Sequence, residues 1–178
     1  MRRAVRDYTD EPVGEATVSQ LIEAATLAPS AINAQPWAFA VVQDRDLLKK
    51  LSDRAKPMLL RLDFPVELTQ MIANPEFNIF YNAGTLIVIC AKPVGEHPDW
   101  DCCLAGENLL LAARDMGLGT CVIGFAWSVL DLPETREELG IPADCRIGLP
   151  VIVGHPAAFP PGHGRNAPEI LSWKLPPA

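Results

Sequence analysis

Residues 28–39 read Ala-Pro-Ser-Ala-Ile-Asn-Ala-Gln-Pro-Trp-Ala-Phe and lie between a predicted helix and the first predicted strand. The preceding helix has apolar side chains at the i, i+3, i+4, i+7 spacing of one buried face. These side chains are Val18, Leu21, Ile22 and Ala25. Pro29 ends this helix, because proline disfavours helical backbone in the residue before it. The loop that follows is rich in hydroxyl and amide groups, and a polar loop held between apolar elements is typical of a binding site.

The composition indicates one globular domain over residues 1–178. With 49% hydrophobic and 21% charged residues, a chain of 178 residues can bury about 70% of its unfolded surface. The net charge of −7 argues against nucleic acid and anionic membranes as partners. No apolar signal segment follows the N-terminal charges, and no apolar run approaches the about 20 residues of a membrane span. We therefore expect a cytoplasmic protein.

Hydrophobic periodicity predicts alternating helices and short strands along the rest of the chain. Residues 85–91 form an unbroken apolar run, which is typical of a strand buried on both faces. Residues 99–116 are apolar around most of a helix circumference, which predicts a central or interface helix. Over residues 57–82 we expect a helical segment followed by a loop that covers a ligand or a subunit interface. The other expected elements are helices over 17–28, 45–55, 130–139 and 168–173 and strands over 38–43, 121–125 and 147–154.

Capping residues mark several of these boundaries. Thr17, Asp44 and Asp131 are candidate N-caps, since short polar side chains accept hydrogen bonds from the first N–H groups of a helix. Gly117 and Gly140 are candidate helix ends, where glycine adopts left-handed backbone at little cost.

Three groups of residues could bind a ligand. Arg2, Arg3 and Arg6 fall within five residues of an acidic chain, where they form either a solvated terminus or an anion site. Arg165 is an isolated basic residue near the other end. The second group is the polar loop over 29–35. The third is the turn over 119–124, whose glycines allow backbone amides to approach a planar ligand.

The sequence offers few catalytic side chains. It has no GxSxG, HExxH or P-loop motif and no Cys/His set with metal-ligand spacing. Its three histidines lie beside prolines or glycines in predicted loops, and its five cysteines lie in apolar runs, which favours surface histidines and buried thiols. If the protein is an enzyme, we expect a bound cofactor to carry the chemistry.

Taken together, three motifs resemble the FMN-dependent nitroreductase superfamily. The first is Arg2-Arg3-Ala4-Val5-Arg6-Asp7-Tyr8, followed by Glu-Pro-Val at 11–13. The second is Ala-Pro-Ser with Asn-Ala-Gln-Pro-Trp over 28–37. The third is the glycine turn over 117–124, followed by Leu-Gly-Ile-Pro at 139–142 and Gly-His-Pro at 154–156. In order and spacing these motifs cover nearly the whole chain. Ala4 stands where the family usually has serine, so one hydroxyl contact to phosphate is missing.

The resemblance implies an α+β fold with a central, mostly antiparallel sheet surrounded by helices, in an intertwined homodimer with FMN at the subunit interface. It implies that Arg2, Arg3, Ala4 and Arg6, with Arg165, hold the FMN phosphate and ribityl chain. A loop of the second subunit would reach the flavin; its matching residues are Pro29, Ser30, Ala31, Asn33 and Gln35. The segment against the flavin ring would comprise Cys121, Val122, Ile123 and Gly124.

The activity that the resemblance implies is ping-pong hydride transfer through flavin N5, with NADH or NADPH as reductant. The small-molecule acceptors would be nitroaromatics, quinones or similar electrophiles, and no protein nucleophile or metal is required. Two alternatives stay open on the same scaffold. One is a reductase for a single metabolite, such as an enone or a halogenated ring. The other is a flavin-binding or storage protein without physiological turnover.

Overall fold

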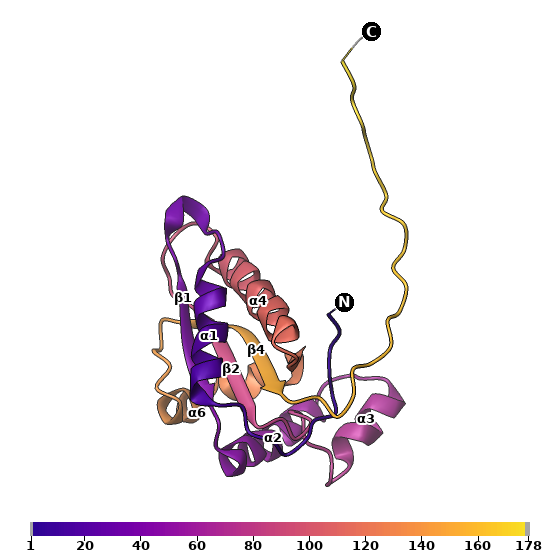
Figure 1. The fold of residues 1–178 in the computed structure, drawn as a ribbon. Coiled ribbons are helices and arrows are strands. Elements are labelled where there is room, and N and C mark those ends of the chain that lie inside the picture. The colour runs from indigo at the N-terminus through magenta and orange to yellow at the C-terminus, as the bar shows by residue number, and fades with distance from the viewer. Residues whose placement is uncertain (1, 177–178) are drawn as a thin grey trace.

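The computed structural model describes residues 2–176, in which a four-stranded sheet is covered by helices on both faces (Figure 1). The strand order is β1-β2-β4-β3, and every neighbouring pair is antiparallel. The strands are β1 (Trp37–Val42), β2 (Thr85–Ala91), β3 (Gly119–Val122) and β4 (Arg146–Gly154). This arrangement confirms the expected α+β class with an antiparallel sheet.

Helices surround this sheet. The α-helices are α1 (Glu15–Thr26), α2 (Arg45–Leu59), α3 (Val66–Ala73), α4 (Pro98–Asp115), α5 (Trp127–Leu130) and α6 (Pro133–Glu138). Two short 3-10 turns are η1 (Ala31–Asn33) and η2 (Gly124–Ala126). None of the helices within residues 2–176 combines the length and the apolar character needed to cross a bilayer.

The alternating side chains of β2 divide the core into two layers. Ile87 and Ile89 pack with buried residues of α1 and α4 on one face of the sheet. Leu86 and Val88 pack with buried residues of α2 and α5 on the other face. All seven residues of β2 are buried, which confirms the predicted strand and its burial on both faces.

Several helix boundaries differ from the predicted ones. Helix α1 begins at Glu15 rather than after Thr17, and Gly14 occupies the cap position without a side-chain hydrogen bond. The acidic Glu15 suits the positive end of the helix dipole, which explains the earlier start. Helix α2 continues through Pro57, because the following turn buries Leu59 against the core. Asp44 caps α2 as predicted, accepting two backbone N–H groups.

The second half of the chain corrects three further expectations. The predicted helix over 130–139 is shortened to α6, since α5 already ends at Leu130, and Asp131 pairs with Arg136 at 2.7 Å instead of capping α6. Strand β3 begins at Gly119 and ends at Val122, two residues earlier at its start than predicted. No helix forms over 168–173; residues 157–176 run away from the sheet as an extended arm (Figure 1). Residues 168–173 are all exposed, so no packing stabilises a single helical turn, which is unstable in isolation.

Helix α4 buries one face against the sheet and exposes the other, so the predicted central or interface helix is central on one side and open on the other in the single chain. Its inner face includes Ala105 and Leu109, which are fully buried against the sheet. Its outer face exposes three large apolar side chains, namely Trp100, Leu104 and Leu111. The apolar pattern seen in the sequence therefore reflects one buried face and one unpartnered face.

The N-terminal segment runs along the β3 edge of the sheet. Ala4 forms a parallel bridge with Thr120, and the Val5 N–H donates to the Thr120 carbonyl oxygen at 2.9 Å. Val5 is fully buried and lies so close to Gly119 that a Cβ there would come within 2.8 Å of the Val5 Cβ. Gly119 is therefore required by this packing, which holds the N-terminal arginines beside β3.

Candidate functional site

A pocket of about 430 Å³ lies between the N-terminal segment, α3 and the end of β3. The residues that line it are Arg6, Leu68, Met71, Tyr81, Cys121, Val122, Ile123, Gly124 and Phe125. Five of these belong to the sequence-predicted site, so the structure brings one arginine of the first motif together with the third motif. The remaining wall is mainly apolar and comes from α3 and from the turn before β2.

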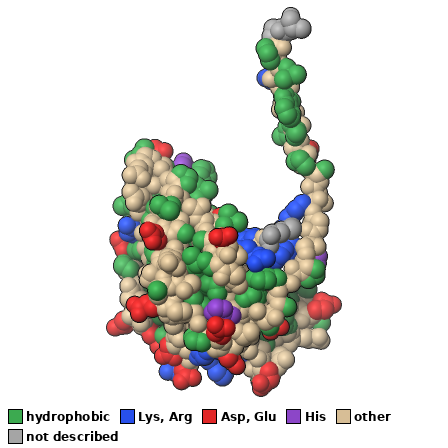
Figure 2. Space-filling model, in the orientation of Figure 1, with side chains coloured by type: hydrophobic (Ala, Val, Ile, Leu, Met, Phe, Trp, Pro, Cys, Tyr) green, Lys and Arg blue, Asp and Glu red, His purple; other side chains and the backbone are tan. Residues whose placement is uncertain are grey.

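The N-terminal arginines are only partly engaged by protein groups. Arg2 Nε lies 3.5 Å from Glu107 Oε1 on α4, and the Arg6 guanidinium lies 5.8 Å from the centre of the Tyr81 ring. Arg3 Nε is buried yet has no hydrogen-bond partner among the described residues. Figure 2 shows basic side chains gathered beside the N-terminal end of the chain. An unsatisfied buried guanidinium donor in such a cluster fits an anionic group such as a phosphate.

The pKa shifts of the pocket residues have two opposing causes. Burial raises the pKa of the Cys121 thiol, whereas the charges of Arg6 and Arg2 lower it. Burial likewise raises the pKa of Tyr81, against the opposing charge of Arg6. Both side chains therefore stay neutral at ordinary pH, and the charge that faces the pocket comes from Arg6.

Gly124 leaves space in the pocket wall. A Cβ at this position would find its nearest neighbour, Trp127 Cζ3, at 4.0 Å, so no protein atom fills the volume in front of the backbone. By contrast, Gly119 is filled by Val5 and cannot receive a ligand. Of the two glycines that bound the predicted turn, the structure leaves only Gly124 accessible to a planar group.

The loop over 29–35 is compact and strained. Ile32, Asn33 and Gln35 have φ angles of 49°, 57° and 47°, a left-handed conformation that is uncommon for residues other than glycine. The Ser30 hydroxyl oxygen accepts the Gln35 N–H at 3.0 Å, which closes the loop. Because that contact uses the hydroxyl as an acceptor, Ser30 retains an O–H donor for a ligand. Sequence patterns gave no sign of this strain.

Within one chain this loop and the pocket lie at opposite edges of the sheet. The loop leads into β1 and the pocket adjoins β3, with β2 and β4 between them. Three strand spacings of about 4.8 Å separate the two edges by about 14 Å. Arg165 lies on the extended arm, where its Nη1 donates to the neighbouring Gly164 carbonyl oxygen at 3.4 Å. The single chain therefore brings Arg6 of the first predicted group to the third group, but not the loop or Arg165.

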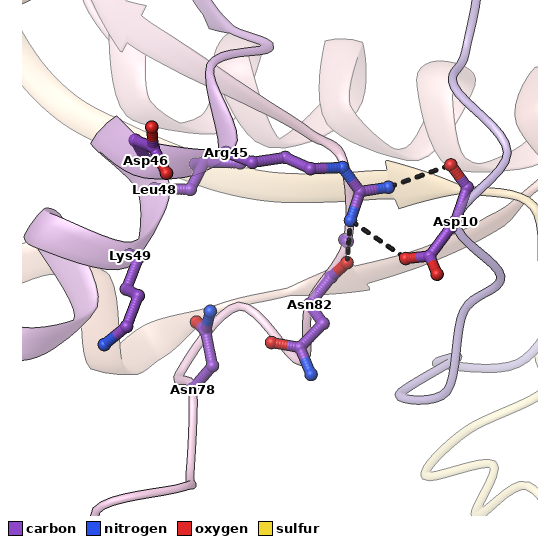
Figure 3. A pocket seen from close by; sticks show the side chains of 8 residues that line it. Asp10, Arg45, Asp46, Leu48, Lys49, Asn78 and Asn82 are labelled. Atoms are coloured by element: carbon purple, nitrogen blue, oxygen red, sulfur yellow. Dashed lines mark hydrogen bonds and ion pairs between the residues drawn. The ribbon is translucent and has the colours of Figure 1, made fainter.

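A second pocket, of about 280 Å³, lies beside the turn that precedes β2 (Figure 3). Arg45 Nη1 donates to Asp10 Oδ1 at 3.3 Å and to the Asn82 carbonyl oxygen at 3.5 Å, and Nη2 donates to the Asp10 carbonyl oxygen. Tyr81 and Asn82 both have positive φ angles. Arg45 therefore clamps a strained turn whose first residue, Tyr81, faces the larger pocket.

The motifs missed four lining residues: Leu68 and Met71 of α3, Tyr81 and Phe125. The aromatic content of residues 57–82 did suggest a segment covering a ligand, and the structure places part of it over the pocket. The T-shaped contact between Phe64 and Phe125, with ring centroids 5.9 Å apart, joins the start of α3 to the pocket wall.

Known proteins resemble this chain over most of its length. The family model described as the nitroreductase family matches residues 1–155. An Archaeoglobus fulgidus protein with the assigned name NADH dehydrogenase/NAD(P)H nitroreductase is 36% identical, over 87% of this chain and 81% of its own length. A Thermus thermophilus protein named NADH dehydrogenase is 43% identical, over 97% and 92% of the two chains. The crystal structure of a Bacteroides fragilis nitroreductase with bound FMN has a TM-score of 0.83 at 26% identity, covering 97% of this chain and 95% of that chain.

Proposed function

Because the chain belongs to the nitroreductase family, we propose that it reduces nitroaromatics, quinones or similar electrophiles with electrons from NADH or NADPH. It is an NAD(P)H-dependent FMN oxidoreductase. The observation that best supports the site is Arg3 Nε, a buried donor that has no hydrogen-bond partner among the described residues and lies in the N-terminal segment along β3.

The residues present fit FMN. Arg2, Arg3 and Arg6 would hold the phosphate and the adjoining chain, since guanidinium groups bind phosphate through charge-assisted hydrogen bonds. The segment from Cys121 to Gly124 would lie against the flavin ring, where the open face of Gly124 permits close approach. When bound, FMN supplies hydride transfer from the nicotinamide to the oxidised acceptor.

The chain's own residues shape the environment of that chemistry. Leu68, Met71 and Phe125 form an apolar wall, which would limit the access of water to a ligand bound in the pocket. Arg6 contributes a positive charge, which stabilises negative charge that develops in the pocket during reduction. The described pocket residues include no base paired with a nucleophile, in keeping with a reaction carried by the cofactor.

We further propose that the functional unit is a homodimer in which the 29–35 loop of one chain completes the pocket of the other. The separation of about 14 Å between the two sheet edges supports this arrangement, because one chain cannot bring both groups to one flavin ring. The exposed apolar face of α4, with Trp100 66% exposed, is suited to the subunit contact. Arg165 would reach the phosphate only if the arm lies across a partner subunit.

Light scattering and thiol labelling test the dimer. Cys103 lies on the exposed side of α4 and is the one cysteine of the chain that is not buried. It should therefore react with an aromatic disulfide reagent in dilute protein and become protected as the concentration rises. A monomer that binds FMN tightly at every concentration would contradict the shared site.

The activity is tested by the absorption spectrum of the purified protein before and after NADH or NADPH is added. We expect a yellow protein that bleaches with reductant and recovers with menadione or a nitrofuran. Yellow protein that neither reductant bleaches would support the storage alternative. All five cysteines are free, which suits a reducing compartment, and we propose the cytoplasm as the site of the reaction.

A further inference from the structure

Asp101 is the only buried carboxylate among residues 2–176, with an exposed fraction of 4%. It lies in the first turn of α4, and neither the motifs nor the pocket involves it. Burying a charged carboxylate is costly unless hydrogen bonds compensate for its lost hydration. The partners of Asp101 therefore indicate what this residue does.

Those partners lie in the 29–35 loop. The Ala31 N–H donates to both carboxylate oxygens of Asp101, at 3.2 Å and 3.3 Å, across 70 residues of sequence. Ala31 begins the turn η1, and the first N–H groups of such a turn have no partner within it. Ser30, which precedes η1, makes no side-chain cap to it. Asp101 thus caps the turn from another element.

The capped turn is the strained part of the loop. Ile32 has left-handed backbone, which is an outlier for a β-branched residue, and Asn33 and Gln35 share this conformation. Strained backbone of this kind persists only where surrounding contacts impose it. Among the described residues, the hydrogen bonds of this turn are its internal ones, the Ser30–Gln35 closure and those to the Asp101 carboxylate. Of these hydrogen bonds, only those to Asp101 connect the turn to another element of the described chain.

We propose that Asp101 is a positioning residue that holds the 29–35 loop in its flavin-binding conformation, an inference that rests on the proposed function of that loop. Helix α4 packs against the sheet through fully buried residues such as Ala105 and Leu109, so its first turn is a fixed anchor. The loop is then preorganised before the cofactor arrives, and FMN binding does not have to supply the free energy of ordering it.

The test uses the full-length apoprotein and three variants. Asp101→Ala removes both acceptors, Asp101→Asn keeps one carbonyl acceptor in nearly the same shape, and Asp99→Asn is the matched control. Asp99 lies on the same turn of α4, is exposed and pairs with Arg146 at 2.9 Å instead of with the loop. FMN affinity is measured by quenching of flavin fluorescence, and the order of the loop by hydrogen exchange of the amides of residues 31–34.

Asp101→Ala should weaken FMN binding about tenfold or more, the effect of losing a hydrogen bond to a charged group. The 31–34 amides should exchange faster, while the β2 amides keep their protection. Asp101→Asn should recover most of the affinity, and Asp99→Asn should match the wild type in both measurements.

Wild-type affinity in Asp101→Ala, or unchanged exchange of the 31–34 amides, would overturn the positioning role. Failure of both Asp101 variants to fold, with Asp99→Asn folded, would overturn it too, since Asp101 would then serve the whole fold. If the wild type itself binds no FMN, the proposed function fails, yet the exchange of the loop amides still decides whether Asp101 anchors the loop.

Discussion

Replacing Arg3 with methionine should change stability and cofactor binding in opposite directions. In the apoprotein Arg3 Nε is buried without a partner, and such an unsatisfied donor costs about 1–3 kcal/mol. Methionine keeps an unbranched apolar stem of similar reach and removes the unsatisfied donor. The Arg3→Met apoprotein should therefore be at least as stable as the wild type, by up to about 2 kcal/mol in the free energy of unfolding.

FMN binding should weaken in the same variant. A hydrogen bond between a guanidinium and a phosphate contributes about 1.5–3 kcal/mol, so the dissociation constant should rise about 10- to 150-fold. Urea unfolding of the apoprotein and fluorescence titration with FMN give the two values. Arg61→Met is the control, because Arg61 is exposed just after α2 and its loss changes the net charge equally.

The reasoning is refuted if Arg3→Met binds FMN as tightly as the wild type, since the phosphate would then be held elsewhere. It is also refuted if Arg61→Met weakens binding as much, because the effect would then come from net charge. A variant less stable than the wild type by more than about 1 kcal/mol would mean that Arg3 contributes to the fold through its other nitrogens.

Three further perturbations follow from the same structure. Gly124→Ala should leave the urea midpoint unchanged, because the nearest neighbour of the new Cβ, Trp127, is 4.0 Å away. The same methyl group should weaken FMN binding, because it fills space in the pocket wall. Equal FMN affinity would mean that the flavin lies elsewhere. Burial raises the pKa of Cys90 from 9.0 to about 11, so the thiol's contribution to stability is complete below about pH 9 and is lost as the pH rises through 11. The free energy of unfolding should therefore fall more steeply over this range in the wild type than in Cys90→Ala, and parallel slopes would contradict this. Arg45→Ala should lower the free energy of unfolding by about 1–2 kcal/mol, because the turn at Asn82 loses the hydrogen bonds of Arg45. Chemical unfolding measures this difference. A difference near zero would mean that water replaces these hydrogen bonds without loss.

Local patterns predicted the parts of the fold that local physics determines. The β2 run was recognised over the full Thr85–Ala91 range, because six consecutive apolar residues after Thr85, three of them β-branched, are typical of a strand buried on both faces. The Asp44 cap and the glycine helix ends at Gly117 and Gly140 were also confirmed, since each depends on the backbone of a few neighbouring residues. The predictions were wrong where tertiary packing overrides local preference, as in the continuation of α2 through Pro57.

The lining of the candidate pocket was predictable only in part, because tertiary packing brings some of its residues together. The motifs identified Arg6 and the segment from Cys121 to Gly124, which the structure places in one pocket. They could not identify Met71, which reaches the pocket through the packing of α3. Nor could they pair Asp101 with Ala31, because no periodicity relates residues that lie 70 positions apart. The resemblance supplied the roles of the motifs, whereas the tertiary structure supplied their supporting contacts.

The free energy of the single chain is raised at both edges of its sheet. At the β3 edge a buried donor of Arg3 is unsatisfied, and at the β1 edge the loop holds Ile32 in a strained conformation. No described residue satisfies the Arg3 donor, and the two edges of one chain lie about 14 Å apart. A flavin held between the β3 edge of one subunit and the loop before β1 of another would accept a hydrogen bond from the Arg3 donor. The same flavin would also contact the strained loop. Binding would then favour the assembled dimer over the free chains, since a ligand stabilises the state that binds it. In the proposed arrangement, FMN binding and the subunit contact therefore stabilise each other. Arg3 and Asp101 would then each contribute to FMN binding and to dimer formation.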